Sequence, residues 1–255
     1  AIRLRRTSRT LAVGHCSRAV PPASAFILHP SSLILPPMPA LAILPVPLAD
    51  ARKALRLSIA APGQSVADLE RQVTAFLEYA RALRLDLGRQ WLLTLDGRPL
   101  AAVTCLEPPG RTAMLFLRDG RLPPPPDDAL LRHAVQQEAQ RDIRLLQCLI
   151  DPDDSVNFAA LTRAGFTELA TLVYMERGIS PDSPPPPAAW SLGALQWRPY
   201  DDELYHLFAG ILSDTYRDSL DCPRLTGLRT IDDIIAGHRA PVLFDPRYWW
   251  LVIRD

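Results

Sequence analysis

The stretch at residues 145–178, LLQCLIDPDDSVNFAALTRAGFTELATLVYMERG, constrains the fold more than any other part of the chain. Residues 145–150 form a nearly unbroken apolar run, which is typical of a strand buried on both faces of a sheet. A helix capped by Asp153 or Asp154 should follow, and Gly165 stands where a left-handed C-terminal cap is expected. A second apolar run comes after that glycine. The order predicts a strand-helix-strand unit of an α/β fold.

Apolar periodicity predicts the elements that precede this unit. They are a strand at 41–46, helices at 48–60 and 66–83, strands at 91–95, 100–107 and 112–117, and a helix at 127–141. Asp96-Gly97 suits a tight type I′ turn, so the two strands beside it should form an antiparallel hairpin. The fold class is therefore α/β, of the α+β kind with a mixed sheet, in which mostly antiparallel N-terminal strands precede the strand-helix-strand half.

This order of elements, with DPDD before the last helix, AGF after it and YMER ending the last strand, resembles the GNAT-fold N-acetyltransferases. The resemblance covers residues 38–179. It implies an acyltransferase that moves an acetyl group from acetyl-CoA to an amine acceptor. From the residues alone, an unrelated α/β core with the same unit is the alternative, because short motif matches carry false positives.

Residues 1–37 carry five arginines, no acidic residue and repeated prolines, and the first methionine is Met38. We expect this leader to lie outside the fold, as a disordered or non-native extension. A targeting peptide is the alternative, since such segments are rich in arginine and poor in acids.

Residues 180–189 form a proline-rich linker, typical of a stiff polyproline II spacer. The second unit, at 190–255, should hold a strand, an amphipathic helix, a helix with a capping box at Thr230 and Asp233, and a last strand. Its strings TYRDSLDCPRLTGLRTIDDIIAGH and FDPRYWWLVIRD resemble the start of the second domain in tandem GNAT proteins similar to mycothiol synthase. The resemblance implies a truncated second GNAT-like domain, in which catalysis is expected.

In the first domain, the resemblance implies that Leu115, Leu117 and Arg121 contact the coenzyme. The family loop R/Q-x-x-G-x-G/A holds the pyrophosphate with backbone amides, but the prolines at 123–126 occupy both glycine positions here. Proline has no amide hydrogen to donate. Leu161 stands where the family has its tyrosine. We therefore expect a degenerate first domain that does not bind acetyl-CoA in the family manner.

In the second unit, polar side chains gather in the connection between its helices. The expected substrate-side contacts are Tyr216, Asp218, Asp221, Cys222 and His238. Loops often display binding groups. The competing interpretation is that Asp221-Cys222-Pro223 shapes a turn and His238 ends a helix. No catalytic residue is assigned.

Composition excludes several classes of function. Net charge is zero, with 28 basic and 28 acidic residues, and the folded regions carry no basic stripe, so we expect no nucleic-acid partner. The four cysteines have no C-x-x-C spacing, so neither a metal nor a disulfide framework is expected. No apolar run is long enough to span a membrane, and a cytoplasmic location fits best. A non-catalytic GNAT-like binding or scaffold module is the alternative function.

Overall fold

The computed structural model describes residues 5–14, 40–118, 127–176, 195–219, 223–240 and 244–254. Residues 5–14 and 40–176 make up the first unit, and residues 195–254 make up the second unit. The strands and helices of the first unit are β1 (Arg5–Gly14), β2 (Leu41–Pro45), α1 (Ala51–Ile59), α2 (Val66–Ala82), β3 (Gln90–Leu95), β4 (Arg98–Leu106), β5 (Thr112–Phe116), α3 (Asp127–Ala139), β6 (Leu145–Ile150), α4 (Ser155–Arg163) and β7 (Phe166–Glu176). Those of the second unit are β8 (Leu195–Pro199), α5 (Tyr205–Tyr216), α6 (Ile231–Arg239) and β9 (Trp250–Arg254).

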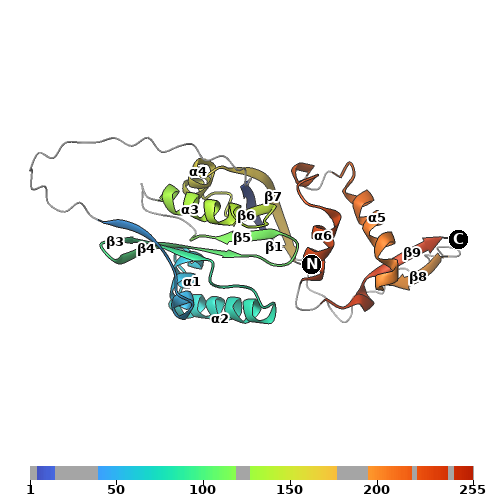
Figure 1. Ribbon diagram of the computed structural model, residues 1–255, viewed down its shortest axis with the longest axis horizontal. Helices are drawn as coiled ribbons and strands as arrows, with labels where there is room; N and C mark the ends of the chain where they lie inside the picture. The colour runs from blue at the N-terminus through green and yellow to red at the C-terminus, as the bar shows by residue number, and fades with distance from the viewer. Residues whose placement is uncertain are drawn as a thin grey trace, which may run out of the picture.

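The first unit is built on a seven-stranded mixed sheet in the order β2-β3-β4-β5-β6-β1-β7. The strands from β2 to β5 pair antiparallel, and β5 pairs with β6 in parallel. Helices α3 and α4 cover one face of the sheet and α1 and α2 cover the other (Figure 1). The predicted mixed α/β fold, with an antiparallel first half and a strand-helix-strand second half, is confirmed.

Local turn and cap chemistry explains why these elements begin and end where they do. The Ser65 hydroxyl accepts a hydrogen bond from the Asp68 amide and caps α2, and the Asp154 carboxylate does the same for the Asn157 amide in α4. The hairpin residues Asp96 and Gly97 have φ values of 50° and 76°, as a type I′ turn requires. The Asp96-Gly97 turn was predicted from the sequence, and Asp154 is one of the two residues predicted to cap α4.

The main core lies between the sheet and the α3/α4 layer. Its fully buried side chains include Leu93, Leu115, Leu130, Leu146 and Phe166. Strand β6 contributes to both faces of the sheet, because Leu146, Cys148 and Ile150 face this core while Leu145 and Leu149 face a second cluster. The prediction of a strand buried on both faces is therefore confirmed.

Within the ranges given above, no helix is long and apolar enough to cross a membrane.

Strand β1 corrects the expectation that the leader lies outside the fold. Residues 5–14 pair antiparallel with β6 on one side and with β7 on the other. Strands β6 and β7 are therefore parallel to each other, and β1 fills the space between them. Ala12 is buried at 2% exposure in the main core. This strand could not be predicted from local pattern, because RRTSRTLAVG does not alternate apolar and polar residues and its partners lie over 130 positions away. Residues 15–37 lie outside the described ranges.

The second unit is a small structure built around aromatic side chains. Strands β8 and β9 pair antiparallel, and α5 and α6 pack beside them. Tyr200, Phe208 and Leu251 form its buried centre, and the Tyr200 ring meets Phe208 edge-on at 4.7 Å and Trp249 at 5.6 Å. Edge-to-face aromatic pairs of this kind add to the stability gained from burial.

The second unit repeats the strand register of the first. In the first unit, β2 pairs with β3 from Leu41↔Leu95 to Pro45↔Trp91, and the Val46 amide donates to the Gln90 carbonyl. In the second, β8 pairs with β9 from Leu195↔Arg254 to Pro199↔Trp250, and the Tyr200 amide donates to the Trp249 carbonyl. Each ladder thus ends on a proline opposite a tryptophan. In both units a short 3-10 helix and two α-helices lie between the paired strands, and the second unit has further 3-10 helices at Pro223–Leu225 and Pro246–Tyr248.

Removing β1 is expected to destabilise the first unit, because β6 and β7 would each lose a hydrogen-bonded neighbour. Ala12→Glu tests the same point with one residue, since a carboxylate buried among apolar side chains costs several kcal/mol. We expect a fall in Tm of about 10 °C or more by thermal unfolding of the full chain. Ala75→Glu, on the exposed side of α2, is the matched control. An equal, small effect at both positions would show that β1 does not pack in the sheet.

Candidate functional site

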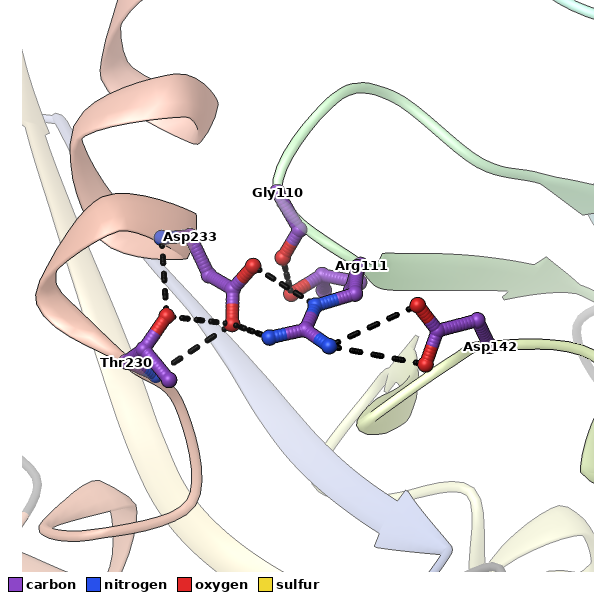
Figure 2. A network of polar contacts seen from close by, with 6 residues as sticks. Gly110, Arg111, Asp142, Thr230 and Asp233 are labelled. Atoms are coloured by element: carbon purple, nitrogen blue, oxygen red, sulfur yellow. Dashed lines mark hydrogen bonds and ion pairs between the residues drawn. The ribbon is translucent and has the colours of Figure 1, made fainter.

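The second unit is attached to the first through an ion pair between Arg111 and Asp233. Arg111 follows the β4–β5 turn, and Asp233 lies in the first turn of α6. The guanidinium Nε donates to Oδ1 and Nη2 donates to Oδ2, both at 2.8 Å, so the contact is bidentate (Figure 2). Asp142 lies on the other side of the guanidinium at 3.4 Å and is largely exposed. Bidentate arginine–carboxylate pairs fix orientation as well as contributing energy.

Asp233 also forms the capping box of α6. The Asp233 amide donates to the Thr230 hydroxyl at 3.2 Å, and the Thr230 amide donates back to the Asp233 carboxylate at 3.3 Å. The predicted capping box is therefore confirmed, and its carboxylate has a second partner that the sequence did not indicate. Hydrogen bonds from Arg111 and then from Thr230 lower the pKa of Asp233 to about 2. One side chain thus holds both the start of α6 and the contact between units.

The backbones of the two units come close beside this pair. Gly110 has a φ of 103°, and a Cβ placed on it would lie 2.3 Å from the Asp233 carbonyl oxygen. Arg111 has a φ of 51°, a left-handed conformation that costs energy for a residue with a side chain. The ion pair accounts for an arginine rather than a glycine at this strained position.

A second contact lies over β6 and β7. Arg224 donates to the Glu168 carbonyl at 2.5 Å, and Leu225 and Leu228 pack with the cluster that contains Leu145 and Leu169. The segment around the 3-10 helix Pro223–Leu225 therefore covers part of the sheet face that α1 and α2 leave open. The first unit supports the connection between α5 and α6 as well as α6 itself.

Two cavities lie in the second unit next to α5 and α6. The Arg229 cavity has a volume of about 400 Å³ and is lined by Ser213, Tyr216, Arg217, Leu225, Thr226, Gly227, Arg229, Ile231 and Ile234. The His238 cavity has a volume of about 330 Å³ and is lined by Phe208, Leu212, His238, Trp249 and Trp250. Tyr216 and His238 connect the two, because the Tyr216 hydroxyl lies 3.4 Å from His238 Nε2.

The structure brings together two of the five predicted substrate-side residues. Tyr216 and His238 are hydrogen-bonded across α5 and α6 although they are 22 positions apart. Asp218 lies just beyond α5, exposed, with a φ of 55°. Asp221 and Cys222 lie outside the described residues. A role in binding stays a prediction for all five.

Sequence reasoning missed the residues that line the Arg229 cavity from the α5–α6 connection. Arg229 stands directly before the capping box, where its position indicates only the approach to a helix. Thr226 and Gly227 read as turn residues. A long connection between two amphipathic helices was the available signal, because long ordered loops frequently carry function.

In the first unit, the region expected to meet the coenzyme lies where β5 and β6 separate. Their parallel pairing ends at Leu115↔Cys148, although β6 continues to Ile150. The side chains of Leu115 and Leu117 are buried in the main core and do not face this opening. The Asn157 amide group donates to the Arg118 carbonyl at 2.7 Å and ties α4 to the chain just past β5.

Asp128 and Leu161 are two described residues that bear on the coenzyme expectation. Asp128 places a carboxylate in the first turn of α3, where Arg163 binds it at 2.6 and 2.9 Å and lowers its pKa. Leu161, at the position of the family tyrosine, is buried at 1% exposure. Arg121 and the prolines at 123–126 lie outside the described residues, so their part in the expectation is untested.

Glu107, the carboxylate at the end of the hairpin, is held in an ion-pair network. Its carboxylate accepts a hydrogen bond from the Arg89 guanidinium at 2.7 Å and another from the Arg141 guanidinium at 3.3 Å. Arg89 also forms an ion pair with the buried Glu138. The two ion pairs with arginines place Glu107 in a structural network between the hairpin, the chain before β3 and the end of α3. Across the part of the chain that the structure describes, no three His, Cys, Asp or Glu side chains are grouped to hold a metal.

Gly110→Ala tests the close approach of the two units. Gly63→Ala is the matched control, because both glycines have a positive φ but nothing lies within 4 Å of a Cβ at Gly63. We expect Gly110→Ala to lower the free energy of unfolding by about 1–3 kcal/mol more than Gly63→Ala does, which is the range typical of overpacking. Urea unfolding of the full chain measures this difference. Equal losses would show that the β4–β5 turn does not contact α6.

The lowered pKa of Asp233 predicts an acid-sensitive contact. Because its pKa falls from 3.8 to about 2 on folding, its stabilising contribution is complete above about pH 4 and is lost as the pH falls towards 2. We expect Asp233→Asn to be less stable than the wild type at pH 5, with the difference shrinking as pH approaches 2 in urea unfolding. The free energy of unfolding of Asp142→Asn should differ little from that of the wild type at any pH. A difference for Asp233→Asn that does not vary with pH would contradict the assignment.

Comparison with known proteins gives distant structural similarity. No family model matches this chain, and no curated protein matches it significantly. A functionally unknown conserved protein from Staphylococcus epidermidis ATCC 12228 has a TM-score of 0.43 and 11% identity, over 68% of this chain and 62% of its own. A putative GNAT-family acetyltransferase from Novosphingobium aromaticivorans DSM 12444 has a TM-score of 0.39 and 13% identity, over 68% of this chain and 65% of its own.

A tandem GNAT protein from the clavulanic acid biosynthesis pathway is similar at a TM-score of 0.39 and 13% identity, over 68% of this chain and 55% of that one. This chain therefore spans less than two thirds of each of these three structures. Similarity at this level does not establish a shared activity, and the fold description rests on the topology of the chain itself.

Proposed function

We propose that this chain belongs to a GNAT-type acyltransferase of the tandem kind, which transfers an acetyl group from acetyl-CoA to an amine in the cytoplasm. In this proposal the first unit is a support without a working coenzyme site. The second unit belongs to the catalytic domain and supplies the acceptor side, for which Tyr216, Asp218, Asp221, Cys222 and His238 are the proposed contacts.

The repeated strand register is the observation that carries the proposal. Pairings of five residues, each ending on proline opposite tryptophan, recur at β2/β3 and β8/β9 with two helices between the strands. The first unit has the element order that resembles the GNAT fold. A second unit that begins with the same pairings supports two copies of one fold in tandem, and this agrees with the tandem resemblance of its sequence.

A supporting role for the first unit rests on the contacts described above. Asp128 at the start of α3, Leu161 in the core and Glu107 in an ion-pair network leave the described part of that unit without the groups that acyl transfer requires. The same unit holds α6 and the α5–α6 connection in place. The second candidate function is a binding or scaffold module with no catalytic activity in either unit. The contacts described here favour a non-catalytic role for the first unit and do not extend it to the second.

Restoring the glycine loop in the full chain tests whether the first unit descends from a coenzyme-binding fold. We expect no measurable acetyl-CoA binding by calorimetry in the wild type. The variant with Pro124→Gly, Pro126→Gly and Asp127→Ser regains two amide donors and loses one opposing charge. Each charge-assisted hydrogen bond contributes about 1.5–3 kcal/mol, so binding should tighten on the order of a hundredfold.

The matched control carries the same two kinds of substitution, Pro185→Gly and Pro187→Gly, in the proline-rich segment at 180–189, which is separate in sequence from the expected coenzyme loop. That control should not bind acetyl-CoA. If the restored loop also fails to bind, the opening between β5 and β6 is not a coenzyme site and the GNAT assignment is wrong. If the wild type binds with micromolar affinity, the first unit is a working site and its supporting role is wrong.

A further inference from the structure

The connection between the two helices differs between the repeated units. In the first unit, six residues (60–65) separate α1 from α2, and the helices are joined by ion pairs from Arg52 and Arg56 to Glu70, both at 2.9 Å. In the second unit, fourteen residues (217–230) separate α5 from α6. The Arg229 cavity of about 400 Å³ lies between these helices and the connection. The Arg229 cavity thus accompanies the longer connection of the second unit.

The lining of this cavity combines apolar and polar groups. Leu225, Ile231 and Ile234 supply apolar surface, and Ser213, Tyr216 and Thr226 supply hydroxyl groups. Leu225 also packs on the cluster over β6 and β7, so the first unit holds one wall in place. The volume falls within the range of about 300–1,000 Å³ that is typical of small-molecule sites.

Arg229 is the cavity's unsatisfied charge. It is half-buried, its Nε is inaccessible to solvent, and its guanidinium has no hydrogen bond or ion pair with another residue of the described chain. A charged donor taken out of water without a partner is costly. The arginines of the first unit show the usual solution, since Arg52 and Arg56 both reach Glu70. With no partner among the described residues, Arg229 is available to an anion that enters the cavity.

The other charges at the cavity limit the charge of that anion. Arg217 also lines the cavity, but it is mostly exposed and pairs with Asp214 at 2.8 Å, so the two cancel. Among the described lining residues, the unpaired Arg229 leaves a net charge of +1. A monoanion balances this charge, whereas a phosphate dianion would meet a single unpaired cation of the described lining and the nearby Asp214 carboxylate. Arginine also matches the planar, two-oxygen geometry of a carboxylate.

We propose that the Arg229 cavity binds a small organic monocarboxylate, whose carboxylate pairs with the Arg229 guanidinium and whose apolar body lies against Leu225, Ile231 and Ile234. The hydroxyls of Ser213 and Thr226 are available to the remaining polar groups of the ligand. That this ligand is the amine acceptor, and so an amino-acid-like compound, rests on the proposed function; the binding itself does not.

The test is a calorimetric titration of the full chain, without acetyl-CoA, with 4-phenylbutyrate and with its neutral counterpart 4-phenylbutanamide. We expect saturable binding of the acid with a dissociation constant of about 1 mM or tighter, given its size. The amide should bind at least about tenfold more weakly, because it cannot form the ion pair. Equal affinity for acid and amide, or no saturable binding of the acid, would overturn the proposal.

Variants locate the site. Arg229→Gln should weaken binding of the acid at least about tenfold. Ser213→Trp, which starts from an exposed position on α5, should fill the cavity and abolish binding with Arg229 still present. Arg247→Gln is the matched control, since Arg247 is exposed and paired with Asp245 outside the cavity. Unchanged binding in both Arg229→Gln and Ser213→Trp would place the ligand elsewhere and overturn the assignment. Loss in Arg247→Gln would do the same.

Discussion

The bidentate pair between Arg111 and Asp233 is the interaction on which the arrangement of the two units depends. Its carboxylate also caps α6, so the start of that helix and its attachment to the sheet share one group. Arg111 adopts a left-handed conformation and Gly110 leaves no room for a side chain, which brings the β4–β5 turn directly against the α6 backbone. The apolar contact of Leu225 and Leu228 extends this attachment to the α5–α6 connection. The first unit thereby determines the shape of the cavity in the second.

The two units show how the same pairing of strands can have different surroundings. Trp91 in β3 is 8% exposed, because β4 pairs beside it and His133 of α3 meets its ring at 5.9 Å. Its counterpart Trp250 in β9 is 49% exposed, since β8 and β9 form a two-stranded sheet within the described residues. A two-stranded sheet is marginal on its own. Contacts with the first unit are therefore a large part of what stabilises the second.

Periodicity and turn chemistry were sufficient to predict most elements of both units. The apolar repeat of α2, the Asp96-Gly97 turn and the capping boxes act locally, so they can be read from neighbouring residues. Strand β1 could not be predicted in this way, because its pairing with β6 and β7 is wholly non-local. Arg111 and Arg229 were missed for a related reason. Whether an arginine has a partner depends on residues brought near it by folding, as Asp233 is brought to Arg111. Tyr216 and His238 could be named, but not paired.

Hydrogen exchange at the α6 amides tests most directly the claim that the first unit holds the second unit in place. The comparison is between the full wild-type chain and Arg111→Gln, with the amides of α2 as an internal reference. The account predicts that Arg111→Gln lowers the protection of residues 231–239 about tenfold or more, as loss of a charge-assisted contact should, while protection in α2 is unchanged. Equal protection of α6 in both proteins would contradict it, because α6 would then be stable without its attachment to the sheet.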